Sequence, residues 1–123
     1  MKPAELKRLC LDLPGAREEF PFDERNSVFK VAGKMFALSP LRAKPLRVSL
    51  KCDPDFAVQL RLQYPAITGG YHLNKRHWNT VVLDGSVPDP LVHQLVEDSY
   101  DLVVAGLPKR EREKLHWVGL ARK

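Results

Sequence analysis

The side chains best suited to binding chemistry gather in one short stretch of the sequence, residues 71–80. The stretch reads Tyr-His-Leu-Asn-Lys-Arg-His-Trp-Asn-Thr, so aromatic, cationic and amide groups lie within a few residues of one another. Lysine and arginine neutralise phosphates, amides hydrogen-bond to phosphates and base edges, and aromatic rings stack on bases. This combination predicts nucleic-acid contacts by Tyr71, His72, Asn74, Lys75, Arg76, His77, Trp78 and Asn79.

A structural role for part of this stretch is the alternative. In an extended strand, Trp78 shares one face with Thr80 and Val82, which is the pattern of a residue that packs in a core. Asn74 is well suited to shaping a turn. The sequence leaves both interpretations open for Trp78 and Asn74, whereas the two cations between them favour binding.

The charges of the chain are unevenly distributed. The formal net charge is +5 and the isoelectric point is about 9.4. Residues 25–51 contain Lys and Arg but no acid, residues 84–101 contain Asp and Glu but no Lys or Arg, and the chain is basic again from residue 109. This separation indicates a positive and a negative side, with ordinary solvated charge as the alternative. The positive side adds three predicted nucleic-acid contacts, Lys34, Arg47 and Lys51.

Catalytic and metal-binding motifs are not found in the sequence. It contains no nucleophile elbow, phosphate loop or HExxH motif. His77, beside Lys75 and Arg76, could serve as a general acid assisted by Glu18 or Glu19. His72 and His77 lack the helical spacing of metal ligands, and the lone cysteines Cys10 and Cys52 form no CxxC pair. We therefore expect a protein that is not an enzyme and that has neither a cofactor nor a metal.

Several secondary-structure elements must position these residues. Hydrophobic spacing and turn residues predict helices over residues 3–11, 54–63, 90–105 and 108–117, and strands near residues 19–22, 27–32, 34–39, 46–51, 67–71 and 78–83. The Asp-Pro pairs at 53–54 and 89–90 are typical of an N-cap followed by the first helical residue. The long third helix should bury Leu91, Val92, Leu95, Val96, Leu102 and Val103 and end at Gly106.

The order of these elements predicts an α+β fold. Hairpin-linked strands with helices between blocks indicate a two-layer sandwich, an antiparallel sheet of five or six strands with helices on one face, in the order α-β(3-4)-α-β(2)-α. The strict alternation of residues 46–51 should point Leu46, Val48 and Leu50 to the core and Arg47, Ser49 and Lys51 to the other face. Residues 1–107 would form this domain, and residues 108–123 a basic C-terminal helix or tail. With no signal peptide or membrane-spanning run, we expect a cytoplasmic protein.

Six runs along the chain carry a resemblance to a known family. They are residues 13–16 (LPGA) with 19–22 (EFPF), 29–31 (FKV) with 33–37 (GKMFA), 50–54 (LKCDP), 71–80 (YHLNKRHWNT), 84–88 (DGSVP) and 99–103 (SYDLV). In order and spacing these runs resemble the MmcQ/YjbR family. The resemblance implies a CyaY-like fold, similar to that of bacterial frataxin and secretion chaperones, and DNA binding. Family positions that match here include Lys34, Lys51, Lys75, Arg76, His77, Trp78 and Asn79, whereas the tail after Lys109 lies outside the resemblance.

Together these observations predict a monomeric DNA-binding protein of low sequence specificity. Its expected partner is duplex DNA, bound through the basic and aromatic surface formed by Lys34, Arg47, Lys51 and residues 71–79. Two other functions remain open: a protein-interaction module with a chaperone-like fold, and a binder of a small phosphorylated ligand at the same basic cluster.

Overall fold

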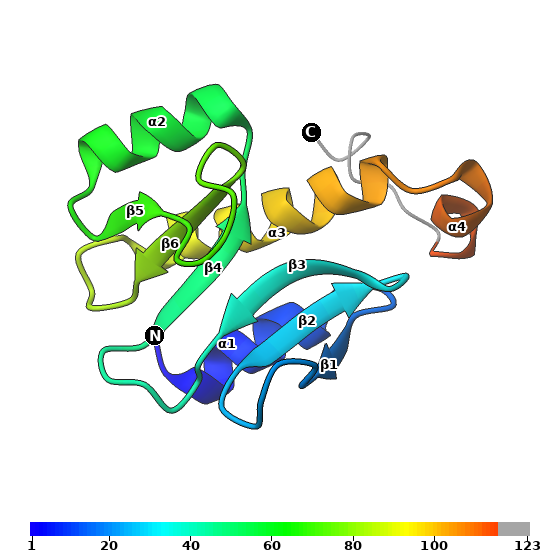
Figure 1. Ribbon diagram of the computed structural model, residues 1–123, viewed down its shortest axis with the longest axis horizontal. Helices are drawn as coiled ribbons and strands as arrows, with labels where there is room; N and C mark the ends of the chain where they lie inside the picture. Colours follow the sequence, from blue (N-terminus) through cyan, green and yellow to red (C-terminus); the bar gives the residue numbers. More distant parts are fainter. Residues whose placement is uncertain (116–123) are drawn as a thin grey trace.

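A six-stranded antiparallel sheet forms the centre of the computed structural model, which describes residues 1–115 (Figure 1). The strands are β1 (Arg17–Glu19), β2 (Ser27–Val31), β3 (Lys34–Ser39), β4 (Arg47–Lys51), β5 (Ile67–Gly69) and β6 (Trp78–Val82). Their order across the sheet is β1-β2-β3-β4-β6-β5, and every neighbouring pair is antiparallel. The predicted sheet and its connectivity are confirmed.

Helices cover one face of this sheet. They are α1 (Pro3–Leu11), α2 (Pro54–Gln63) and α3 (Asp89–Ala105). A short fourth helix, α4 (Lys109–Lys114), follows α3 and buries none of its residues. The long helix α3 packs across β2, β3 and β4, α1 packs beside α3, and α2 covers the β5 end (Figure 1). This arrangement confirms the two-layer α+β fold. Within residues 1–115, no helix is both long and apolar enough to cross a bilayer.

The alternation of β4 assigns the two faces of the sheet as predicted. Val48 and Leu50 are buried toward the helices and pair with Val81 and Asn79 of β6. Ser49 lies on the opposite face and pairs with Thr80. Because successive side chains of a strand point to opposite faces, this register fixes which residues of β4 and β6 remain on the helix-free face.

Strands β3 and β4 share fewer paired residues than any other two neighbouring strands of the sheet. Only two residues of each strand are paired in the backbone ladder, Ala37 with Leu50 and Leu38 with Ser49. The Ser39 hydroxyl adds one bond, because it donates to the Arg47 carbonyl at 2.6 Å. The hydroxyl of Ser99 in α3 reinforces the junction, because it donates to the Phe36 carbonyl at 2.6 Å and accepts from the Lys51 N–H at 2.8 Å. One helix residue is thereby bonded to both strands.

The helix starts differ in detail from the sequence prediction. Asp53 caps α2 as expected, since its carboxylate accepts from the N–H groups of Asp55 and Phe56 at 3.1 and 3.2 Å. The second cap was predicted wrongly: Pro88 is the N-cap of α3, and Asp89 is already helical with no side-chain cap. Asp89 still favours the helix, because a carboxylate in the first turn interacts with the helix dipole.

Two further predictions need correction, and a third extends beyond the described residues. The first strand is Arg17–Glu19 rather than residues 19–22, because Asp23 folds the following residues into a turn by accepting from the N–H groups of Arg25 and Asn26. Leu102 is exposed, because it lines a solvent-open cavity at the side of α3, whereas the neighbouring Val103 and Val104 are buried. Helix α4 ends at Lys114, and the predicted end at residue 117 lies outside the described residues.

Candidate nucleic-acid interface

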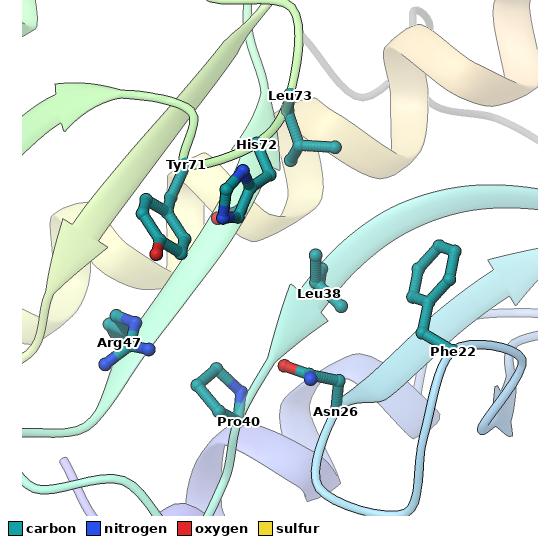
Figure 2. Close-up of a pocket in the computed structure, with 9 residues that line it drawn as sticks. Phe22, Asn26, Leu38, Pro40, Arg47, Tyr71, His72 and Leu73 are labelled. Atoms are coloured by element: carbon teal, nitrogen blue, oxygen red, sulfur yellow. The ribbon is translucent and has the colours of Figure 1, made fainter.

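Two loops enclose a groove on the helix-free face of the sheet. Residues 20–26 form one wall and residues 70–77 the other, with β3 and β4 beneath them (Figure 2). The cavity between the loops has a volume of about 350 Å³. We call it the open-face groove, and it is lined by Phe22, Asn26, Leu38, Pro40, Arg47, Ser49, Tyr71, His72 and Leu73.

The loop of residues 70–77 is anchored to β6. Gly70 N–H donates to the Trp78 carbonyl at 2.8 Å, and Tyr71 N–H donates to the Thr80 hydroxyl at 3.0 Å. A side chain at Gly70 would place its Cβ 2.7 Å from the Cβ of Trp78, so only glycine allows this close approach. Asn74 shapes the turn, since its side-chain oxygen accepts from Arg76 N–H at 2.9 Å. The loop is therefore held in place by its own hydrogen bonds.

Exposed aromatic rings stand on both walls of the groove. Tyr71 is 62% exposed, and its ring lies beside that of His72 with the centroids 4.0 Å apart. Phe22 on the other wall is 67% exposed. Figure 2 shows Tyr71 and His72 together above β4, with Phe22 across the groove from them. Exposed rings on anchored loops are available for stacking on a flat ligand.

The cations of this face are not neutralised by acids. Arg47 lies half-buried in the floor of the groove, and Lys75 and Arg76 are exposed on the neighbouring loop. In residues 1–115 no ion pair joins any of these three side chains to a carboxylate. Since an unpaired cation in a partly desolvated groove attracts anions more strongly than a fully solvated one, Arg47 is the residue best placed to bind a phosphate.

Asn79 is a correction to the predicted set of binding residues. Its side chain is only 3% exposed and lies on the helix side of the sheet. The amide nitrogen donates to the Ala57 carbonyl at 3.3 Å, and the amide oxygen accepts from Arg61 at 3.2 Å. Asn79 therefore joins α2 to the sheet and has no surface to offer to nucleic acid.

The remaining predicted residues are placed at varying distances from the groove. Lys34 lies at the β2–β3 turn, about 13 Å along the strand from Leu38 at 3.3 Å per residue. Lys51 borders a second cavity on the helix side, but its pairing with Trp78 places its side chain on the helix-free face. Trp78 is half-buried beneath the 70–77 loop on the helix-free face, so it is not a core residue, and His77 is half-buried with its carbonyl accepting from Cys52 N–H.

Sequence reasoning missed one wall of the groove. Phe22 and Asn26 lie in a segment whose start was predicted as a strand, and Leu38, Pro40 and Ser49 were assigned no role in a site. The available signal was the Phe-Pro-Phe run at residues 20–22 followed by Asp23, because Asp favours turns and a turn exposes its neighbours. Recognising that turn would have indicated two exposed rings.

A second cavity of about 230 Å³ lies between α2 and α3 and is acidic. Its lining includes Asp53, Asp98 and Asp101 together with Phe56 and Leu95. An acidic cavity is unsuited to a polyanion. In residues 1–115, no group of three or more His, Cys, Asp or Glu is arranged to hold a metal ion.

Both cysteine thiols are stabilised in the protonated form. Burial raises the pKa of Cys52, which borders the acidic cavity, to about 11, and the carboxylates of Asp53 and Asp98 add to the effect. Burial also raises the pKa of Cys10 to about 12, with Glu18 contributing. Because the thiolate is the reactive form of cysteine, neither thiol is suited to nucleophilic chemistry.

We expect both thiols to resist alkylation in the folded protein. At pH 8, a shift of the Cys52 pKa from 9.0 to about 11 lowers the thiolate fraction about a hundredfold. Iodoacetamide labelling followed by mass spectrometry should show Cys10 and Cys52 unmodified in native protein and both modified in urea. Rapid labelling of either residue in native protein would show that its thiol is more accessible or more acidic than the structure indicates.

Comparison with known proteins places the chain in a family. Residues 11–102 match the sequence model of the YjbR family. The chain belongs to the YjbR family. Its relatives include the Escherichia coli K12 protein YjbR, 38% identical over 94% of this chain and 98% of that protein, and YbdF of Escherichia coli O157:H7, 41% identical over 89% of each.

Solved structures agree with this membership. The crystal structure of Deinococcus radiodurans DR2400, described as a DUF419 domain, matches with a TM-score of 0.88 and 45% identity over 94% of this chain and 88% of that one. A Pseudomonas syringae protein matches with a TM-score of 0.61 and 29% identity over 71% of this chain and 86% of its own. The open-face groove falls wholly within residues 11–102, the part of this YjbR-family chain that the family model covers.

Proposed function

We propose that this YjbR-family protein binds DNA with low sequence specificity through the open-face groove and the cations beside it. The observation that carries the proposal is the gathering of Arg47, Tyr71 and Phe22 around one groove on the helix-free face. The loop that carries Tyr71 also carries the exposed cations Lys75 and Arg76. Cations supply the salt-dependent attraction to phosphates, and aromatic rings supply contacts that tolerate any base.

The separation of charge over the molecule supports the same proposal. Arg47 lies in the groove on the helix-free side, whereas the acidic cavity formed with Asp53, Asp98 and Asp101 lies between helices on the other side. Lys75 and Arg76 lie at the β5 edge, on the loop that carries Tyr71, where the Lys75 side chain packs against Gly69 and its ammonium donates to the Gly70 carbonyl at 3.3 Å. A field of this kind orients a polyanion toward the groove as it approaches.

We expect low sequence specificity because the groove has few side chains free to recognise base edges. Base-specific recognition uses helices in the major groove and amides or Arg paired with base edges. None of the described residues that line the groove belongs to a helix, and Asn79 is buried. The amide nitrogen of Asn26 already donates to Asp23, and the side-chain oxygen of Asn74 already accepts from Arg76 N–H. Phosphate contacts are left as the main source of affinity, and they are insensitive to sequence.

The first test is the double variant Lys75→Ala with Arg76→Ala. The wild-type protein should bind a random-sequence duplex with a log–log salt slope of about −3 to −4.5, corresponding to about three to five phosphates. The double variant should bind about tenfold more weakly, with a slope reduced by about 2. Both positions are exposed, so the free energy of unfolding should change by at most about 0.5 kcal/mol per site.

The matched control removes the same charge elsewhere. Lys109→Ala with Arg110→Ala changes two exposed cations of α4, away from the groove. Affinity should stay within about twofold of wild type, since the removed charges do not border the bound DNA. Equal losses in the two double variants would refute the site and indicate diffuse electrostatic attraction. Absence of binding to any DNA at low salt would refute the function.

A small phosphorylated ligand is the second candidate, favoured by the size of the groove. Its volume of about 350 Å³ lies within the range of roughly 300–1,000 Å³ typical of small-molecule sites. Arg47 and His72 supply polar groups at its floor and wall. Thermal stabilisation by a nucleoside monophosphate at micromolar concentration, with no affinity for DNA, would favour this candidate over the first.

A further inference from the structure

We propose that the open-face groove holds an unpaired base of a single-stranded segment, so that the protein prefers single-stranded to duplex DNA. This inference rests on the proposed DNA binding and adds the form of DNA that is recognised. It assigns stacking to Phe22 and Tyr71 and the phosphate or base-edge contact to Arg47.

The shape of the groove carries the first part of the argument. Its floor contains the apolar side chains of Leu38 and Pro40, and each wall presents one exposed ring, Phe22 or Tyr71 (Figure 2). A flat heteroaromatic base has two apolar faces and a polar edge. The groove offers rings to the faces and the Arg47 guanidinium to the edge or to the attached phosphate, which matches the composition of single-strand binding sites.

Hydrogen bonds hold both walls of the groove in place, which is the second reason to expect base stacking. Tyr71 stands on a loop that its own N–H and that of Gly70 bond to β6. Phe22 precedes a turn closed by Asp23, whose carboxylate accepts from the N–H groups of Arg25 at 2.8 Å and Asn26 at 3.0 Å and also from the Asn26 amide. Rings that are already positioned lose little freedom when a base stacks on them, and this raises affinity.

The groove is too small for a DNA duplex to enter it. A cavity of about 350 Å³ has room for isolated rings but not for paired strands. A base within a duplex is covered by its neighbours and must leave the stack before it can enter, at a cost of a few kcal/mol. A single strand avoids that cost, so it should bind through the rings and the cations together, whereas a duplex should use the cations alone.

The experiment compares one labelled 12-nucleotide single strand with the matching duplex by fluorescence anisotropy at fixed salt. The single strand should bind about tenfold more tightly to the wild-type protein. Phe22→Ala and Tyr71→Ala should each weaken single-strand binding about tenfold and duplex binding less than twofold. Tyr71→Phe keeps the ring and should keep the affinity, and circular dichroism checks that each variant is folded.

A matched control and a local probe complete the design. Phe56→Ala removes an exposed ring from α2, on the other side of the sheet, and should leave binding of both DNA forms unchanged. A 2-aminopurine base in the single strand should change its fluorescence on binding to wild type but not to Tyr71→Ala. Loss of affinity in Tyr71→Phe equal to that in Tyr71→Ala would overturn the stacking role.

The results of these measurements distinguish a failure of the single-strand preference from a failure of DNA binding itself. Equal affinity for both DNA forms, unchanged in Phe22→Ala and Tyr71→Ala but reduced in the Lys75 and Arg76 double variant, overturns the inference and retains DNA binding. Binding of neither form at low salt overturns the proposed function and the inference together.

Discussion

Leu95→Asp should leave the protein unfolded at room temperature. Leu95 is only 5% exposed and lies with Leu50, Leu60 and Val81 around a small internal cavity where α2 and α3 meet the sheet. Removing a buried leucine costs about 2–5 kcal/mol, and burying an unpaired carboxylate adds several more. Because domains of this size are stable by about 5–15 kcal/mol in total, the sum is enough to unfold the chain.

The matched control makes the same change on a helix surface. Leu62 of α2 is 83% exposed, so Leu62→Asp should change the free energy of unfolding by no more than about 0.5 kcal/mol. Near-ultraviolet circular dichroism and urea titration would compare the two variants. A Leu95→Asp protein with native spectra would show that α3 does not pack on the sheet as the structure places it.

Arg47→Glu should give the largest loss of DNA binding among single substitutions. Loss of the Arg47 guanidinium removes a charge-assisted hydrogen bond to DNA worth about 2–3 kcal/mol. The new carboxylate in the groove floor also repels the phosphates. We therefore expect an affinity about thirty- to a hundredfold lower for single-stranded DNA, measured by anisotropy at fixed salt. The salt slope should also become shallower by about 1.

Arg8→Glu is the matched control for this charge reversal. Arg8 is an exposed residue of α1, on the helix-covered side of the sheet, and its substitution changes the net charge equally. Its effect on DNA affinity should stay within about threefold. If both reversals weaken binding to the same extent, net charge rather than the groove determines affinity. Thermal melting would check that Arg47→Glu, at a half-buried position, remains folded.

Much of the fold was predictable because its signals are local. The alternation of residues 46–51 was enough to assign the faces of β4, since a strand has only two faces and Leu46, Val48 and Leu50 must be buried together. The Asp-Pro start of α2 was equally predictable, because an N-cap needs only its own neighbours.

The groove was not predictable, because it depends on pairing between distant parts of the chain. Phe22 and Tyr71 lie on opposite walls only because β2, β3, β4 and β6 lie in consecutive order in the sheet. The position of Asn79 shows the same limit. A polar residue beside a tryptophan is expected to be the exposed one, yet Asn79 is buried because Ala57 and Arg61 of α2 supply hydrogen-bond partners there.

The short junction between β3 and β4 has a consequence for ligand entry. The groove straddles that junction: Phe22, Leu38 and Pro40 belong to the half of the sheet that holds β1–β3, whereas Arg47 and Tyr71 belong to the half that holds β4–β6. A small rotation of one half against the other would open or close the aperture between the rings. Two hydroxyls bonded to both halves, that of Ser99 from the helix side and that of Ser39 within the sheet, oppose such a rotation.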